Sequence, residues 1–187
     1  MVERVMFSPG GFEAKYGDKM SSVLDITYHR PNKFGGKISG SLLGGSAYVE
    51  GTIKEKFTYS IGLRRHSNQY LLNTLDTEGD YTSAYTDMQT ILTYKASPKL
   101  DISFLGIYSK NKCGLVPQNQ TTNFGNFFEA MQLRVYFDGQ EIDEYTTMMG
   151  AVTFDYRPNE NMQWKWITSA YTTNESEVYD IQGQYWL

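Results

Sequence analysis

The chain has 187 residues, of which 40% are hydrophobic and 15% aromatic, and this composition excludes a largely disordered chain. The formal net charge of −4 and the pI near 5.2 leave no basic footprint for a nucleic-acid partner. No run of about 18 apolar residues is present, so we expect no transmembrane helix. The many aromatic residues and threonines, with few helix formers, favour an all-β protein.

The first segment, residues 10–31, is predicted to contain a tight turn, about one helical turn and an extended stretch. Gly10 and Gly11 allow the chain to reverse direction. Residues 21–30 alternate between two faces, and the strand should end before Pro31, because the residue that precedes a proline is restricted to extended geometry. From these residues alone, the segment could be ordinary scaffold.

After Pro31 the sequence alternates with a period of two in seven segments, which predicts seven strands. They are residues 36–43, 46–53, 57 toward 72, 85–96, 100–109, 145–157 and a last strand from 162. A glycine pair, Gly44-Gly45, predicts a hairpin after the first strand. The later connections are alternately short and long: 54–56, 73–84, 97–99, 110–141 and 158–161.

This alternation places the short turns at one end of an antiparallel up-and-down meander and both long loops at the other. Such an arrangement is typical of outer-membrane β-barrels. Aromatic residues on the apolar faces lie within a few positions of the short turns, as an interfacial girdle requires. They are Phe57, Tyr59, Tyr94, Tyr156, Trp164 and Trp166. A soluble sandwich or a lipocalin-like barrel remains an alternative to this interpretation.

The N-terminal residues also carry a family motif. Val2-Glu3-Arg4-Val5, Gly11, Tyr16-Gly17 and the stretch SSVLDI at residues 21–26 follow one another in the order found in the C-terminal part of the plug of TonB-dependent outer-membrane receptors. The chain resembles this family, and most closely its Bacteroidetes type. Residues 48–51, Tyr-Val-Glu-Gly, resemble a glutamate-glycine step early in these barrels. Ser8-Pro9-Gly10 departs from the family, which often has an arginine before the glycine turn.

The resemblance implies that residues 1–33 are the C-terminal part of a plug domain and that residues 34–187 are the first strands of a 22-stranded barrel. About seven strands cannot close a barrel, so the chain would be an excerpt of a longer receptor. The implied function is TonB-dependent active import across the outer membrane of a Gram-negative bacterium, with no enzymatic activity and no cofactor. The implied partners are the inner-membrane TonB complex, the lipid bilayer and a surface lipoprotein. Arg65 lies on the apolar face about eight residues above Phe57, near the expected outer headgroup layer, where either a lipopolysaccharide phosphate or solvent would be its partner.

Two groups of candidate site residues follow. Aromatic residues of the two long loops are candidate stacking surfaces for the imported ligand, namely Tyr81, Tyr85, Phe124, Phe127 and Phe128. The resemblance also implies that Arg4 of the plug meets carboxylates of the barrel, and Glu50 is one candidate partner. His29 and His66 lack the neighbouring carboxylates or cysteines of a metal site, and no catalytic motif is present.

Two other classes of protein remain as alternatives. A soluble β-rich module that binds carbohydrate or another ligand would need apolar side chains on both sheet faces, whereas the second face here is polar. A passive porin would need no plug, whereas the plug motif is present. The residues do not specify the transported substrate.

Overall fold

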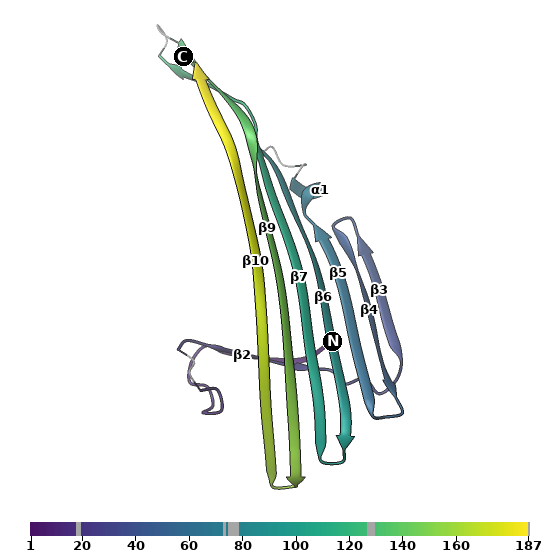
Figure 1. Ribbon diagram of the computed structural model, residues 1–187. Helices are drawn as coiled ribbons and strands as arrows, with labels where there is room; N and C mark the ends of the chain where they lie inside the picture. The colour runs from purple at the N-terminus through teal and green to yellow at the C-terminus, as the bar shows by residue number, and fades with distance from the viewer. Residues whose placement is uncertain (18–19, 73, 75–78, 127–129, 187) are drawn as a thin grey trace.

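The computed structural model describes residues 1–17, 20–72, 74, 79–126 and 130–186, and the protein is all-β with antiparallel sheets (Figure 1). Strands β1 (Val2–Ser8) and β2 (Val23–Tyr28) form a two-stranded sheet, which we call the N-terminal hairpin. The other strands form one eight-stranded sheet, which we call the wall. They are β3 (Gly35–Ser41), β4 (Gly44–Ile53), β5 (Phe57–Ser67), β6 (Gly79–Ser97), β7 (Leu100–Pro117), β8 (Gln120–Gly125), β9 (Ala130–Asn159) and β10 (Met162–Trp186).

The wall is the predicted up-and-down meander. Its order is β10-β9-β7-β6-β5-β4-β3, so the seven long strands lie beside their neighbours in the chain, and β8 adds a short pairing to β9. The short turns after β4, β6 and β9 lie at the lower end in Figure 1, and the longer connections lie at the upper end. One of these contains the single-turn helix α1 (Gln69–Leu72). Within the described residues, no helix is long and apolar enough to cross a membrane.

The predicted extents of the two long loops were wrong. Strand β6 already begins at Gly79, β7 continues to Pro117, and β9 begins at Ala130 and runs for 30 residues. The extension of β9 still alternates, with Met131, Leu133, Val135 and Phe137 on one face. In β6, however, the residues before Tyr85 are mostly small or polar, so the alternation of apolar residues stops there while backbone pairing continues. Strand β5, by contrast, ends at Ser67 rather than continuing toward Leu72.

The glycine pair does not form the first hairpin turn either. Leu42 and Leu43 form that turn, and Gly44 is the first residue of β4. Gly44 has a φ of 146°, and a Cβ there would lie 2.1 Å from the carbonyl oxygen of Arg65. Because Gly44 has no side chain, β4 can approach the backbone of β5 closely at this position.

The two faces of the wall have different surroundings. The buried side chains of Ser60, Thr93 and Ala151 belong to the face that lies against the N-terminal hairpin, which we call the inner face. The hairpin runs across the direction of the wall strands (Figure 1). The opposite or outer face leaves large aromatic side chains in the open, with Trp164 64% and Trp166 71% exposed. The small interior therefore lies between the hairpin and the polar side of the wall.

Candidate functional site

A cleft of about 700 Å³ separates the N-terminal hairpin from the inner face of the wall. On the hairpin side its lining includes Arg4, Tyr16 and Asp25. On the wall side it is lined mostly by small and polar side chains of β5, β6, β7, β9 and β10, among them Thr58, Ser60, Thr93, Ser103, Thr153 and Ser169. Apolar side chains from both parts also line the cleft, among them Leu24, Ile26, Ile91, Leu105 and Met149, so the boundary between the two parts is mixed.

Among the described residues, contacts from the N-terminal hairpin and its flanking residues to the wall include those of Arg30, Tyr28 and Met1. Arg30, in the connection after β2, places its Nη1 2.7 Å from Oδ2 of Asp101 on β7. Gln89 of β6 donates a hydrogen bond from Nε2 to the hydroxyl of Tyr28, at 2.9 Å. Met1 reaches β5, where a Cβ on Gly62 would lie 2.8 Å from its sulfur. Gly62 thus provides the space in which the N-terminal residue packs.

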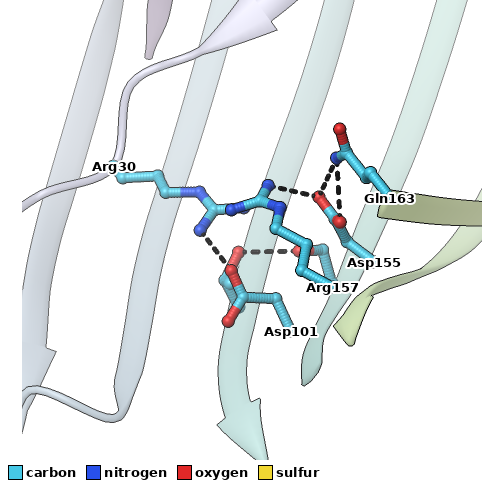
Figure 2. Close-up of polar contacts among 7 residues, drawn as sticks. Arg30, Asp101, Asp155, Arg157 and Gln163 are labelled. Carbon is cyan, nitrogen blue, oxygen red and sulfur yellow. Dashed lines mark hydrogen bonds and ion pairs between the residues drawn. The ribbon is translucent and has the colours of Figure 1, made fainter. Parts of the chain in front are cut away.

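The Arg30 contact belongs to a group of charges near the short turns (Figure 2). Asp101 and Asp155 are directly opposite each other on β7 and β9, and like charges in that position repel. Each carboxylate forms an ion pair with an arginine. Asp101 pairs with Arg30, and Asp155 pairs with Arg157, whose Nη2 lies 2.7 Å from Oδ2 of Asp155. Gln163 of β10 also donates to Asp155, at 2.9 and 3.0 Å. The wall therefore supplies the ion-pair partner of Asp155, and the N-terminal segment supplies that of Asp101.

The predicted contact of Arg4 with Glu50 has no counterpart among the ion pairs of the described residues. Arg4 lines the cleft, whereas Glu50 accepts a hydrogen bond from the hydroxyl of Tyr48 and lies against Gly35. Within the hairpin segment, Tyr16 donates a hydrogen bond to Asp25, and that bond raises the pKa of the Tyr16 phenol. The role of Arg4 and Glu50 stays a prediction.

A second group of polar residues lies on the inner face nearer the long connections. Tyr85 of β6 is opposite His66 of β5, and their rings stack with centroids 5.2 Å apart. The guanidinium of Arg64 lies 5.0 Å from the centroid of the Tyr85 ring and is paired with Asp87 at 3.0 Å. His66 also forms a hydrogen bond with the side-chain oxygen of Asn68, at 2.7 Å. We call Arg64, His66, Tyr85 and Asp87 the aromatic-cation group.

Of the predicted stacking residues, the structure brings Tyr81 and Tyr85 onto the same face of β6, four positions apart. Phe124 is 42% exposed but lies on β8, where it is opposite Met131 of β9. Phe127 and Phe128 lie outside the described residues. The sequence analysis did not predict that Arg64 and His66 belong to this group. Both side chains lie on the polar face of β5, and the register between β5 and β6 places them opposite Asp87 and Tyr85.

The upper part of β9 and β10 carries a third polar feature. The hydroxyl of Tyr145 donates a hydrogen bond to Oε1 of Glu177, at 2.9 Å. This bond, together with desolvation and the nearby carboxylates of Asp143 and Glu175, raises the pKa of Tyr145 from 10 to about 12. The phenol is therefore a stable donor at neutral pH.

No group of three or more His, Cys, Asp or Glu side chains is placed to hold a metal ion in the part of the chain that the structure describes. Comparison of the chain with family models, with curated proteins and with solved structures found no match. The arrangement of the site therefore has to be interpreted from its own residues and from the resemblance of its N-terminal motif.

Proposed function

We propose that this chain is part of a TonB-dependent outer-membrane receptor, in which the wall is a section of the membrane barrel and the N-terminal hairpin is the last part of the plug. The receptor would import a substrate actively across the outer membrane when the inner-membrane TonB complex displaces the plug. The observation that carries this proposal is the bare apolar band on the outer face of the wall.

The band has the height of a membrane. On β9 its first and last members are Tyr156 and Met148, eight positions apart. At about 3.4 Å per residue this is about 27 Å along the strand, or about 21 Å perpendicular to the membrane at a tilt of about 40°. The apolar band of outer-membrane barrels is about 25 Å tall. The main outer-face members in register on the other strands are Phe57, Tyr59, Ile61, Leu63, Met88, Leu92, Tyr94, Ile102, Phe104, Tyr108, Phe154, Trp164 and Trp166.

The distribution of aromatic residues in the band supports the same proposal. Trp164 and Trp166 lie just after the short turn between β9 and β10, and Phe154 is opposite Trp166 with ring centroids 6.2 Å apart. A soluble protein would cover such rings, because each carries a large apolar area whose exposure to water is unfavourable. At the edge of a hydrocarbon layer the same rings are favourable.

The inner face supports a plug rather than an open channel. The N-terminal hairpin occupies the space beside the wall and is held by Arg30, Tyr28 and other polar contacts. This arrangement agrees with the plug resemblance of residues 2–31 and argues against the passive porin. Above the hairpin, the aromatic-cation group presents an ordered ring at Tyr85, which we propose as a substrate contact.

The proposal is tested by the position of the tryptophans. The protein, expressed in a Gram-negative host and reconstituted in phosphatidylcholine bilayers, should lose most of the fluorescence of Trp164 and Trp166 when the lipid carries bromine on its acyl chains. Trp186, at the far end of β10, should be quenched little. Variants of the whole receptor that keep Trp164, Trp166 or Trp186 as the single tryptophan, with phenylalanine at every other tryptophan position, separate these signals. Recovery of the protein in the detergent-free soluble fraction would favour the soluble binding module instead.

Transport itself is tested in cells. Uptake of the substrate should require both the protein and an energised TonB complex, whereas diffusion through a porin requires neither energy nor TonB. Uptake that persists in a strain without TonB would exclude the proposed mechanism.

A further inference from the structure

The outer face changes character abruptly one step above the apolar band. The last apolar row consists of Leu63, Met88, Tyr108 and Met148, which are in register across β5, β6, β7 and β9. The next row on the same face consists of Arg65, Thr86, Lys110 and Thr146. In one strand position the surface therefore passes from aliphatic and aromatic side chains to two cations and two hydroxyls.

A third cation lies in the row above. Lys112 is on the same face of β7 as Lys110, and it is directly opposite Glu144 of β9. Glu144 contacts both lysines, with Oε2 3.3 Å from the Nζ of Lys110 and Oε1 3.0 Å from that of Lys112. These contacts lower the pKa of Glu144, so it remains a carboxylate at neutral pH. Glu144 compensates one of the three positive charges, and we call Arg65, Lys110, Lys112 and Glu144 the cationic rim.

The cations of the rim are accessible. The side chains of Lys110 and Lys112 remain 46% and 49% exposed despite their contact with Glu144, and Arg65 is exposed as well. Arg65 has no ion-pair partner among the residues that the structure describes. Two strand spacings separate Arg65 from Lys110, which is about 10 Å, and about 7 Å separates the two lysines along β7. An area of this size fits one headgroup with one or two phosphates.

We infer that the cationic rim binds the anionic phosphates of outer-leaflet lipid headgroups. The inference rests on the proposed membrane position of the wall, and it adds a defined lipid site with named residues. Continuity with the apolar band selects a lipid as the occupant, because its acyl chains would lie along Tyr108 and Met148 while its phosphates meet the rim. Phosphate is also well matched by two hydroxyls that can donate hydrogen bonds, that of Thr86 between Arg65 and Lys110 and that of Thr146 opposite Lys110.

The test compares lipids that differ in charge. The protein, purified in a neutral detergent, is titrated with diphosphoryl lipid A and separately with phosphatidylcholine, and bound lipids are counted by native mass spectrometry. Each basic residue near an anionic headgroup contributes about fivefold in affinity, so a net excess of two charges predicts about 30-fold tighter binding of lipid A. The preference should weaken at high salt, because the rim is exposed.

Three variants make the test specific. Arg65→Gln/Lys110→Gln/Lys112→Gln should lose the preference for lipid A, whereas the charge-preserving Arg65→Lys/Lys110→Arg/Lys112→Arg should keep most of it. The matched control is Lys15→Gln/Lys37→Gln/Lys165→Gln, which removes three charges from the hairpin segment and the inner face and should also keep it. Correct folding of each variant is checked by the quenching of Trp164 and Trp166 in brominated phosphatidylcholine.

The outcomes separate this inference from the proposed function. Equal binding of the two lipids by the unchanged protein, or an equal loss in the matched control, overturns the lipid site. If the lipid site is overturned but brominated lipid still quenches Trp164 and Trp166, the proposed membrane position of the wall holds without the lipid site. If bilayer lipid quenches neither tryptophan in the unchanged protein, the proposed function and the lipid site fail together.

Discussion

Replacement of Arg30 by alanine should loosen the N-terminal hairpin from the wall. The change removes the bond to Asp101, and it leaves that carboxylate directly opposite Asp155 without its ion-pair partner. Because Val23 and Pro31 are the buried side chains of this segment among the described residues, few other contacts can take over.

The expected magnitude follows from the exposure of the two partners. Asp101 is only 17% exposed, but Arg30 is 50% exposed, so the pair lies between an exposed ion pair and a buried one. Exposed pairs contribute about 0.2–1 kcal/mol, and hydrogen bonds to charged groups about 1.5–3 kcal/mol. We expect about 1.4 kcal/mol here, which corresponds to a tenfold more frequent opening of the hairpin.

Hydrogen exchange of the β1 and β2 amides measures this opening. In the Arg30→Ala protein these amides should exchange about tenfold faster, while amides of β5 and β6 are unchanged. Lys15→Ala is the matched control, because Lys15 pairs with Glu13 at the exposed surface of the same segment, at 2.9 Å. Asp101→Asn should have an effect of similar size, and the double variant should add little to either. Unchanged exchange in β1 and β2 would refute the reasoning.

Three further predictions concern separate parts of the molecule. Gly44→Ala should destabilise the protein by about 2 kcal/mol or more in urea unfolding, because the new Cβ would collide with the backbone of β5, whereas Gly40→Ala, with open space around it, should cost less. Glu177→Gln should return the pKa of Tyr145 from about 12 toward 10 in a near-ultraviolet titration referenced to Tyr145→Phe; no change would mean that the bond is absent in solution. Tyr85→Ala should weaken substrate uptake at low substrate concentration, and an unaltered half-saturation concentration would exclude it as a substrate contact.

The period-two alternation of the sequence predicted those wall strands correctly in which one face is apolar and the other is polar. In β5, Phe57 and Leu63 share one face and Ser60 the other, and the same contrast holds for the lower halves of β6, β7 and β9. Before Tyr85 on β6 the residues are mostly small or polar on both faces, so little contrast remains to reveal a strand. On β9, by contrast, Met131, Leu133, Val135 and Phe137 alternate with more polar residues, a strand signal that the predicted loop overlooked.

The contacts of the candidate site were harder to predict because they join residues distant in the chain. Arg30 and Asp101 are 71 positions apart, and nothing near Arg30 in the sequence indicates its partner. The sequence contained one signal. Asp101 and Asp155 each lie next to a short turn, on the polar faces of two strands that were predicted to be neighbours. Two inward carboxylates in that position favour nearby cations, and the strand register offers Lys95 opposite Asp101 and Lys165 opposite Asp155, so the sequence did not single out Arg30.

The distribution of stability in the molecule has a consequence for the proposed gating. The wall is held by continuous backbone ladders from β3 to β10, whereas the N-terminal hairpin is held to it mainly by polar side-chain contacts such as Arg30–Asp101 and Tyr28–Gln89. Regions with few buried apolar contacts open at lower free energy than the rest of a protein. A plug that must move under force while its barrel stays intact needs this difference. Because the ion-pair partner of Asp101 comes from the segment after the hairpin, departure of the hairpin would break that ion pair, and its reformation favours the return of the hairpin.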